Sequence, residues 1–192
     1  MAVSKVNGKA ALGGRIWSQL KVFVGGPIQF AFTKHSQFDP WLRTHILQII
    51  DLIESMGIEV FSAHRYERFG ELNVVGKSCQ VARRDFAWMQ ACDLFVVVLP
   101  DHDGRLVRTD GTHIELGWAS AFYKPILLFR DPTISGSHLL EGLDTVSPVS
   151  TLPLNMIDND PEQVVETIHN ILTNLPDARL ASSGLTAVDL KD

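Results

Sequence analysis

The sequence predicts an α/β protein with a doubly wound, five-stranded, mainly parallel sheet and helices on both faces. Two short apolar runs, at residues 94–99 and 126–129, are typical of strands that are buried on both faces. Apolar residues within 41–56 recur at helical spacing. Because strands and helices of this kind alternate along the chain, we expect parallel strands with right-handed crossovers that place helices on either side.

Local signals place each element. Strands are expected over residues 21–25, 58–62, 94–99 and 126–129, and a fifth near 152–157. Helices are expected over residues 41–56, 78–91, 112–122 and 161–175. Gly57 suits the C-terminal cap of the first helix, and Pro161 suits the first turn of the last. The architecture is Rossmann- or flavodoxin-like, with a ligand edge formed by loops 25–38, 62–76 and 100–111.

Composition excludes several classes of function. The 192 residues are 45% hydrophobic and carry a formal net charge of -5, which argues against a nucleic-acid partner. No apolar run approaches the length of a membrane span, so no membrane partner is expected. Cys79 and Cys92 form no CxxC motif, and a lone pair of thiols fits a cytoplasmic location.

The domain organisation is expected to be simple. Residues 20–175 carry the alternating elements and are predicted to form a single catalytic domain. Residues 1–19 resemble a loose leader, because they lack the apolar core of a secretory signal. Residues 176–192 have small side chains and no clear period, which predicts a mobile tail.

The segment from Asp110 to Ala119 is the strongest indication of function. It places Glu115 about one turn into a helix that follows a buried strand, where ligands bind in open α/β sheets. A second acid, Asp85, lies on the preceding helix. Paired carboxylates over a crevice suggest chemistry at the anomeric carbon of a sugar. The alternative is that Thr112 and Glu115 form a capping box, T-x-x-E, with no chemical role.

The residues around these acids resemble a known family. Segments 84–98, 111–119 and 124–130 are similar to the nucleoside 2-deoxyribosyltransferase superfamily, and the resemblance spans 21–143. The chain looks closest to the branch that hydrolyses nucleoside 5'-monophosphates, which includes 2'-deoxynucleoside 5'-phosphate N-hydrolases and cytidylate hydrolases. The segments Gly25-Gly26-Pro27-Ile28 and Ser62-Ala63-His64-Arg65 are more similar to the cytidylate type.

The resemblance implies roles for particular residues. Glu115 matches the nucleophile, and Asp85, eight residues before Asp93, matches the helper acid. Six residues before the nucleophile, the transferases carry Asp and the monophosphate hydrolases carry Ser, whereas this chain has Thr109. A neutral hydroxyl can donate a hydrogen bond to a phosphate that a carboxylate would repel, which favours a 5'-phosphorylated substrate.

The first loop departs from the family pattern. The deoxynucleotide hydrolases use Gly-Ser-x-Arg there, and Pro27 and Gln29 stand at the matching positions. Phosphate contacts are therefore expected from His64, from Arg65, or from free N–H groups at the start of the 112–122 helix. The alternative for His64 and Arg65 is a polar strand end without function.

In the family, a phosphate-binding serine comes from a neighbouring subunit, and Ser137 matches it. The resemblance therefore also implies a homodimer with the site near the subunit interface. The candidate substrate-binding residues are Gly25, Gly26, Ile28, His64, Arg65, Thr109, Gly111, Thr112 and Ser137. The base could stack on one of four aromatic residues, Phe23, Phe30, Phe32 and Tyr66.

Other side chains carry plainer expectations. Arg83 and Arg84 are predicted to be an exposed helical pair, and Trp88, Trp118 and Phe122 to make core or subunit contacts. No histidines show the i, i+4 spacing of a zinc site, so neither a metal nor another cofactor is implied.

The sequence thus predicts an N-glycosidase that hydrolyses a nucleoside 5'-monophosphate, with a CMP-type pyrimidine nucleotide preferred, to free base and (deoxy)ribose 5-phosphate. Two alternatives stay open. One is a deoxyribosyltransferase that exchanges bases, and the other is a non-catalytic protein that binds or senses a nucleotide.

Overall fold

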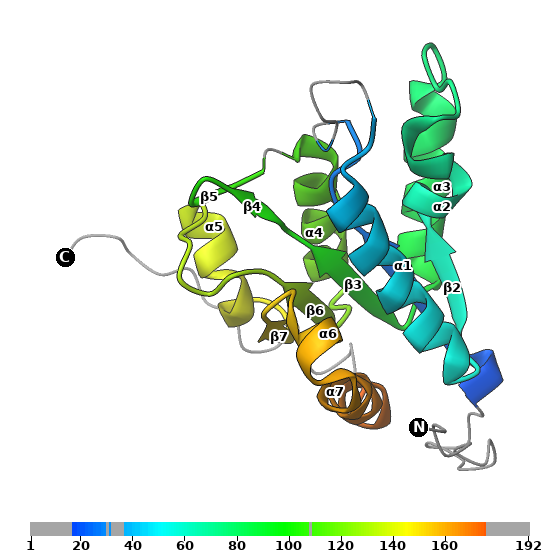
Figure 1. The fold of residues 1–192 in the computed structure, drawn as a ribbon. Coiled ribbons are helices and arrows are strands. Elements are labelled where there is room, and N and C mark those ends of the chain that lie inside the picture. Colours follow the sequence, from blue (N-terminus) through cyan, green and yellow to red (C-terminus); the bar gives the residue numbers. More distant parts are fainter. Residues whose placement is uncertain (1–16, 30, 32–36, 108, 176–192) are drawn as a thin grey trace, which may run out of the picture.

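The computed structural model describes residues 17–29, 31, 37–107 and 109–175. Its centre is a sheet of five strands in the order β2-β1-β3-β6-β7, all parallel (Figure 1). The strands are β1 (Lys21–Gly25), β2 (Glu59–Ser62), β3 (Leu94–Val98), β6 (Ile126–Phe129) and β7 (Val149–Leu152). The α/β class is confirmed, and the order is that of flavodoxin-like sheets.

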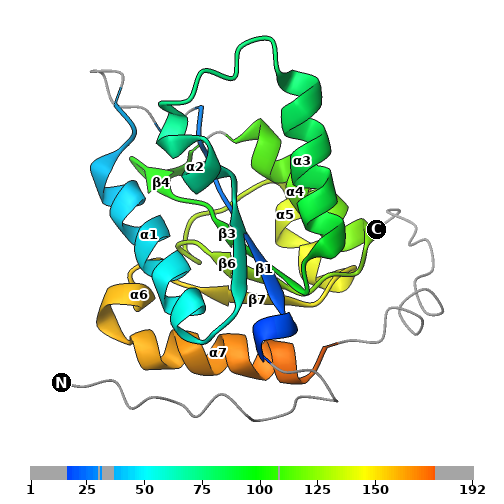
Figure 2. The same ribbon diagram turned by 90° about the vertical axis from the view of Figure 1, so that its right-hand side faces the viewer.

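Helices cover both faces of this sheet. Figure 2 shows α1 (Pro40–Ser55) on one side, and α3 (Ser78–Ala91) and α4 (Asp110–Ala121) on the other, while buried residues of α7 (Pro161–Thr173) belong to the same core as those of α1. Alternate residues of each strand point to opposite faces, so Val22 and Val24 pack in the α1–α7 core and Phe23 packs in the α3–α4 core. Strands buried on both faces explain the continuous apolar runs.

The fifth strand was predicted too far along the chain. β7 pairs with β6 from Val149 to Leu152 and ends there. Pro153 then follows, which has no N–H to continue a ladder. The remaining residues of the predicted strand turn into the short helix α6 (Met156–Asn159).

The loop predicted at 100–111 contains a small hairpin. Strands β4 (Asp101–His102) and β5 (Arg105–Leu106) pair antiparallel. Asp103 and Gly104 join them with φ angles of 52° and 72°. An Asp-Gly pair with two positive φ angles is typical of a two-residue hairpin turn.

The long helices begin and end at residues that the sequence marks. α1 starts at Pro40, and the Asp39 side chain accepts a hydrogen bond of 2.8 Å from Leu42 N. Gly57, with φ of 82°, follows its last turn as expected. α7 starts at Pro161, as predicted, after its N-cap residue Asp160.

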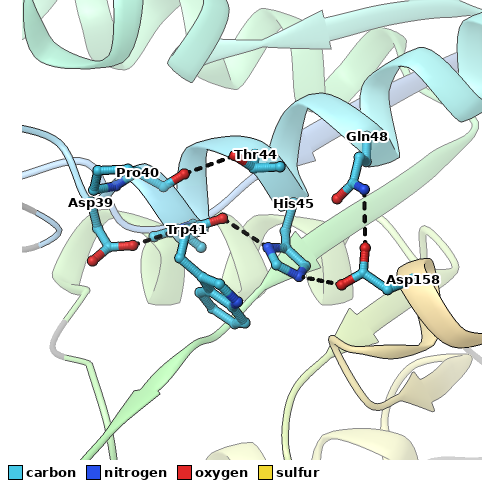
Figure 3. A network of polar contacts seen from close by, with 8 residues as sticks. Asp39, Pro40, Trp41, Thr44, His45, Gln48 and Asp158 are labelled. Atoms are coloured by element: carbon cyan, nitrogen blue, oxygen red, sulfur yellow. Dashed lines mark hydrogen bonds and ion pairs between the residues drawn. The ribbon is translucent and has the colours of Figure 1, made fainter.

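A polar network attaches α6 to α1 (Figure 3). His45 Nδ1 lies 2.7 Å from the Trp41 carbonyl oxygen, and Nε2 lies 2.9 Å from Asp158 Oδ2. Gln48 donates to the other oxygen of Asp158 at 3.0 Å. His45 and Asp158 are 113 positions apart in the sequence, so the network joins two distant segments that both contribute to the α1–α7 core.

The short elements complete the described chain: η1 (Trp17–Gln19), α2 (Ala63–Tyr66), η2 (Arg68–Gly70), α5 (His138–Glu141) and η3 (Leu143–Thr145). Trp17 is buried, with its ring 5.2 Å from that of His169 on α7, so the end of the predicted leader belongs to the core. Residues 1–16 of the predicted leader and the predicted tail, 176–192, lie outside the described residues. Among the helices described, none is long and apolar enough to cross a membrane.

Candidate active site

The strand order reverses between β1 and β3, because the chain goes from β1 to one neighbour, β2, and later returns to the other, β3. Crevices that bind ligands form outside the carboxyl ends of strands at such a point. A pocket lies there, at the end of the sheet that faces upward in Figure 2. It is lined by Gly25, Gly26, Ile28, Gln29, Ala63, Glu67, Val81, Asp85, Thr109, Asp110, Gly111, Thr112 and Glu115.

Glu115 is held against the end of β1. Its side chain is buried on the second turn of α4. A Cβ atom on Gly25 would lie 2.9 Å from Glu115 Oε2 and 2.8 Å from Cε2 of Phe95, closer than real atoms approach. Gly25 therefore leaves the space that the carboxylate occupies, which is a physical reason for glycine at this position.

The capping-box alternative is wrong. α4 begins at Asp110 with Thr109 as its N-cap residue, so Thr112 and Glu115 both lie inside the helix. The Thr112 hydroxyl bonds instead with the Thr109 hydroxyl. Glu115 is therefore free of a capping role, and its carboxylate opens on the pocket.

Asp85 is fixed by the arginine beside it. Arg84 Nε donates to Asp85 Oδ1 at 2.7 Å, and Nη2 donates to Asp85 Oδ2 at 3.2 Å. The same Nη2 donates to Glu67 Oε1 at 2.6 Å. The guanidinium carbon also lies 4.8 Å from the ring centres of Tyr66 and Trp88. Charge-assisted hydrogen bonds and cation–π contacts thus hold the arginine and two carboxylates as one unit.

The prediction of an exposed Arg83–Arg84 pair is wrong for Arg84, whose side chain is only 14% exposed. Glu67 was missed altogether. It follows α2 directly and is buried in the pocket wall. The available signal was its position in the loop 62–76, which the sequence already assigns to the ligand edge.

Burial and mutual repulsion shift the pKa values of the two acids. Burial raises the pKa of Glu115 well above its usual value, the charges of Asp85 and Glu67 raise it further, and Arg84 opposes them. Burial also raises the pKa of Asp85, but its bonds to Arg84 oppose the increase. The site therefore favours the protonated form of Glu115 strongly, whereas the bonds from Arg84 favour the ionised form of Asp85.

Other predicted binding residues meet at the same pocket. Gly25, Gly26 and Ile28 approach from the β1 side. Thr109, Gly111 and Thr112 form the first turn of α4 and its cap. Free N–H groups and the helix dipole make this turn favourable for an anion.

His64 does not line the pocket. It is fully buried, and its Nε2 donates to the Pro27 carbonyl oxygen at 3.1 Å. Its ring packs edge-on against Phe38, with centres 5.9 Å apart. Burial lowers the pKa of His64 to about 4, so the ring is neutral near pH 7. Its observed contact supports the loop that carries Gly26 rather than reaching toward a ligand.

Arg65 and Ser137 also lie away from the pocket. Arg65 forms an ion pair of 2.7 Å with Glu54 of α1 and donates to the Val60 carbonyl oxygen at 3.1 Å. Ser137 Oγ accepts from Leu140 N at the start of α5. It lines a second hollow, which shares Thr109 and Asp110 with the main pocket.

The aromatic candidates for base stacking are not all placed. Phe23 is buried in the α3–α4 core. Tyr66 is 61% exposed and contacts Arg84. Phe30 and Phe32 lie outside the described residues. Trp88, Trp118 and Phe122 are partly buried against the α3–α4 core, in agreement with the expected packing role.

The described residues contain no cluster of His, Cys, Asp or Glu that could hold a metal ion. The fold and pocket define a class: an open parallel α/β sheet with three buried carboxylates, those of Glu67, Asp85 and Glu115, at its switch point. Residues 32–166 match the profile of the family described as nucleoside 2-deoxyribosyltransferase, and the chain belongs to this family. The family is enzymatic and acts on N-glycosyl bonds.

Two solved structures are similar at moderate identity. The Clostridium botulinum CMP N-glycosidase BcmB is 26% identical, with a TM-score of 0.52 over 76% of this chain and 98% of that one. BlsM, solved in solution, is 27% identical, with a TM-score of 0.64 over 89% of this chain and 99% of that one. A search of curated protein sequences gives no significant match.

Proposed function

We propose that the protein is a nucleoside 5'-monophosphate N-glycosidase that hydrolyses the N-glycosidic bond to free base and (deoxy)ribose 5-phosphate, with CMP as the preferred type of substrate. One observation carries the proposal: the buried carboxylates of Glu115 and Asp85 line a single pocket at the first turns of α4. The similarity to BcmB, a CMP N-glycosidase, supports the choice of reaction and substrate.

Glu115 acts as the nucleophile and Asp85 handles the proton. As the C1'–N bond breaks, its electron pair leaves with the base, which takes a proton from Asp85, while Glu115 forms a bond to C1'. Water then attacks C1', gives a proton to Asp85 and releases Glu115. Burial raises the pKa of both acids, which favours a proton in the site, and positive charge at C1' favours the carboxylate form of Glu115, so Asp85 is the acid that carries this proton during bond cleavage.

The first turn of α4 is the proposed phosphate site. Thr109 and Thr112 bring hydroxyl groups to the pocket beside Gly111, whose lack of a side chain leaves the helix end open. Neutral donors and a helix N-terminus suit a doubly negative phosphate better than an uncharged 5'-hydroxyl. This supports a nucleotide over a nucleoside as substrate.

A homodimer is part of the proposal. Ser137 does not line the main pocket of its own chain, which is compatible with the role that the resemblance implies for it, in the phosphate site of a neighbouring subunit. Ile114 on α4 and Leu139 on α5 are 54% and 87% exposed, which suits burial at a subunit contact. We expect the mass of a dimer in sedimentation equilibrium, and a monomer at assay concentrations would contradict this part of the proposal.

A substrate panel tests the reaction. The protein is incubated with ribo- and deoxyribonucleoside 5'-monophosphates and with their parent nucleosides, each with and without a second free base. We expect base release from monophosphates, with CMP among the best substrates, and little from the nucleosides. A new nucleoside formed from the added base, without dependence on phosphate, would identify a transferase. Tight nucleotide binding with no base release would identify a non-catalytic binding protein.

A further inference from the structure

We propose that Glu67 recognises the exocyclic amino group of the substrate base, so that the pocket selects amino bases such as cytosine over oxo bases such as uracil. The proposal rests on the function proposed above and adds a residue that determines which base is cleaved. Four structural features support it: the position of Glu67 along the pocket, its link to Asp85 through Arg84, its carboxylate oxygen that is available to a ligand, and the apolar side chains around it.

The pocket extends over the carboxyl ends of three adjacent strands. Glu67 follows β2 and α2, Gly25 ends β1, and α4 begins after β3 and the β4–β5 hairpin. β1 lies between β2 and β3, and neighbouring strands are about 4.8 Å apart. The Glu115 carboxylate marks the middle of this row, because it approaches Gly25. A nucleotide with C1' at Glu115 and its phosphate at α4 therefore directs its base toward β2 and Glu67.

The link to Asp85 independently places Glu67 beside the base. One nitrogen, Arg84 Nη2, donates to Asp85 at 3.2 Å and to Glu67 at 2.6 Å, so the two carboxylates share an anchor. Asp85 must contact the leaving base in order to exchange a proton with it. Glu67, bound to the same guanidinium nitrogen, is then within reach of the edge of that base.

The Glu67 carboxylate has one oxygen available for a ligand. Oε1 accepts from Arg84, whereas Oε2 accepts no hydrogen bond from the part of the chain that the structure describes. An ionised carboxylate only accepts hydrogen bonds. The amino groups of cytosine and adenine are donors at the base edge, whereas uracil and thymine present a carbonyl oxygen there. Glu67 is thus complementary to an amino base and repels the oxo group of uracil.

The surrounding surfaces suit a flat ring. Ala63, Val81 and Ile28 bring apolar side chains to the pocket, and Ala63 and Val81 lie on the elements that flank Glu67, α2 and α3. Small-molecule sites combine apolar walls with a few placed polar groups that fix orientation. The rings of Tyr66 and Trp88 hold Arg84, so the polar group that orients Glu67 is itself restrained.

The test is the substitution Glu67→Gln, which keeps the shape and the acceptor oxygen but replaces the second oxygen with an amino donor. We expect wild type to prefer CMP over UMP in kcat/KM by about 10–100-fold, and the variant to reduce this ratio by about tenfold or more. The ratio is the readout because altered charge near Asp85 changes turnover of both substrates alike. Binding of CMP and UMP, measured by calorimetry with and without Glu67→Gln in a Glu115→Gln background that does not consume the nucleotide, is expected to change in the same order.

Glu141→Gln is the matched control. Glu141 is also held by an arginine, with Arg130 bonds of 2.9 and 2.8 Å, but it lies outside the pocket. We expect its CMP to UMP ratio to equal that of wild type. An unchanged ratio in both kinetics and binding of Glu67→Gln would overturn the proposal, as would a change confined to the CMP to dCMP ratio, which would place Glu67 at the sugar. If wild type releases no base from any nucleotide, the proposed reaction fails, while the binding ratios still decide the role of Glu67.

Discussion

Glu115→Gln is expected to reduce kcat with CMP by at least about 10³-fold, because an amide can neither form the bond to C1' nor stabilise its positive charge as a carboxylate does. Glutamine has the shape of glutamate, so it fits the space that Gly25 leaves beside Phe95. The loss is therefore expected in a folded protein. The measurement is base release under single-turnover conditions, together with the circular dichroism spectrum.

The same variant has an expected effect on stability that a capping residue would not show. Because the folded pKa of Glu115 lies well above the usual 4.5, the folded state binds more protons than the unfolded state above that pH. Wild type therefore loses free energy of unfolding as pH rises from about 4.5 through the folded pKa. Glutamine has no such dependence, so Glu115→Gln is expected to be as stable as wild type or more stable at pH 7. Retained activity, or a loss of stability at pH 7, would contradict the assignment.

The fold could be predicted from local patterns because its central strands are buried on both faces. The segment Leu94 to Val98 is a continuous apolar run for that reason. β7 shows where prediction from apolar runs fails. It lies at the edge of the sheet, so Ser150 and Thr151 are tolerated and the apolar signal is weak. The sequence therefore predicted the existence of a fifth strand but not its position.

The candidate site was partly predictable for a related reason. Glu115 lies one turn into a helix that follows a buried strand, so the sequence pattern predicts its place at the ligand edge, whereas Asp85 was assigned through the family resemblance. The directions of His64 and Arg65 were not predictable in this way. Each depends on a partner from another segment, Pro27 for His64 and Glu54 for Arg65. Side chains that follow a strand share the ligand edge, but tertiary contacts decide which of them open on the pocket.

Arg84 illustrates the same limit on the helix α3. From sequence it is one of two adjacent arginines on a helix. In the structure its guanidinium contacts Glu67, Asp85 and two aromatic rings, and those groups come from the loop 62–76 and from α3. The charge balance of the site, three carboxylates and one guanidinium, is therefore a tertiary property. Together with burial, it sets the directions in which the pKa values of Glu115 and Asp85 shift.

Asp85→Asn is expected to reduce kcat with CMP by about 10²–10⁴-fold, the usual contribution of a positioned proton donor or base. Asparagine still accepts from Arg84 Nε at the position of Oδ1, and the substitution removes only the longer bond from Nη2, which keeps its bond to Glu67. The expected defect is in proton transfer, so its size should depend on whether the leaving group must be protonated in order to depart. A substrate with ribose 5-phosphate attached to 4-nitrophenol has a leaving group that departs as the anion and needs no proton.

With that substrate, the Asp85→Asn and Glu115→Gln variants are expected to show different kinetics. In Asp85→Asn, Glu115 still attacks C1', so one equivalent of nitrophenol per site is released in a burst. Slow turnover follows, because no base activates water for the second step. Glu115→Gln is expected to give no burst, since no bond to the enzyme can form. Stopped-flow absorbance measures both. Equal loss with CMP and with the nitrophenyl substrate in Asp85→Asn, without a burst, would mean that Asp85 only positions groups and that the proton comes from elsewhere.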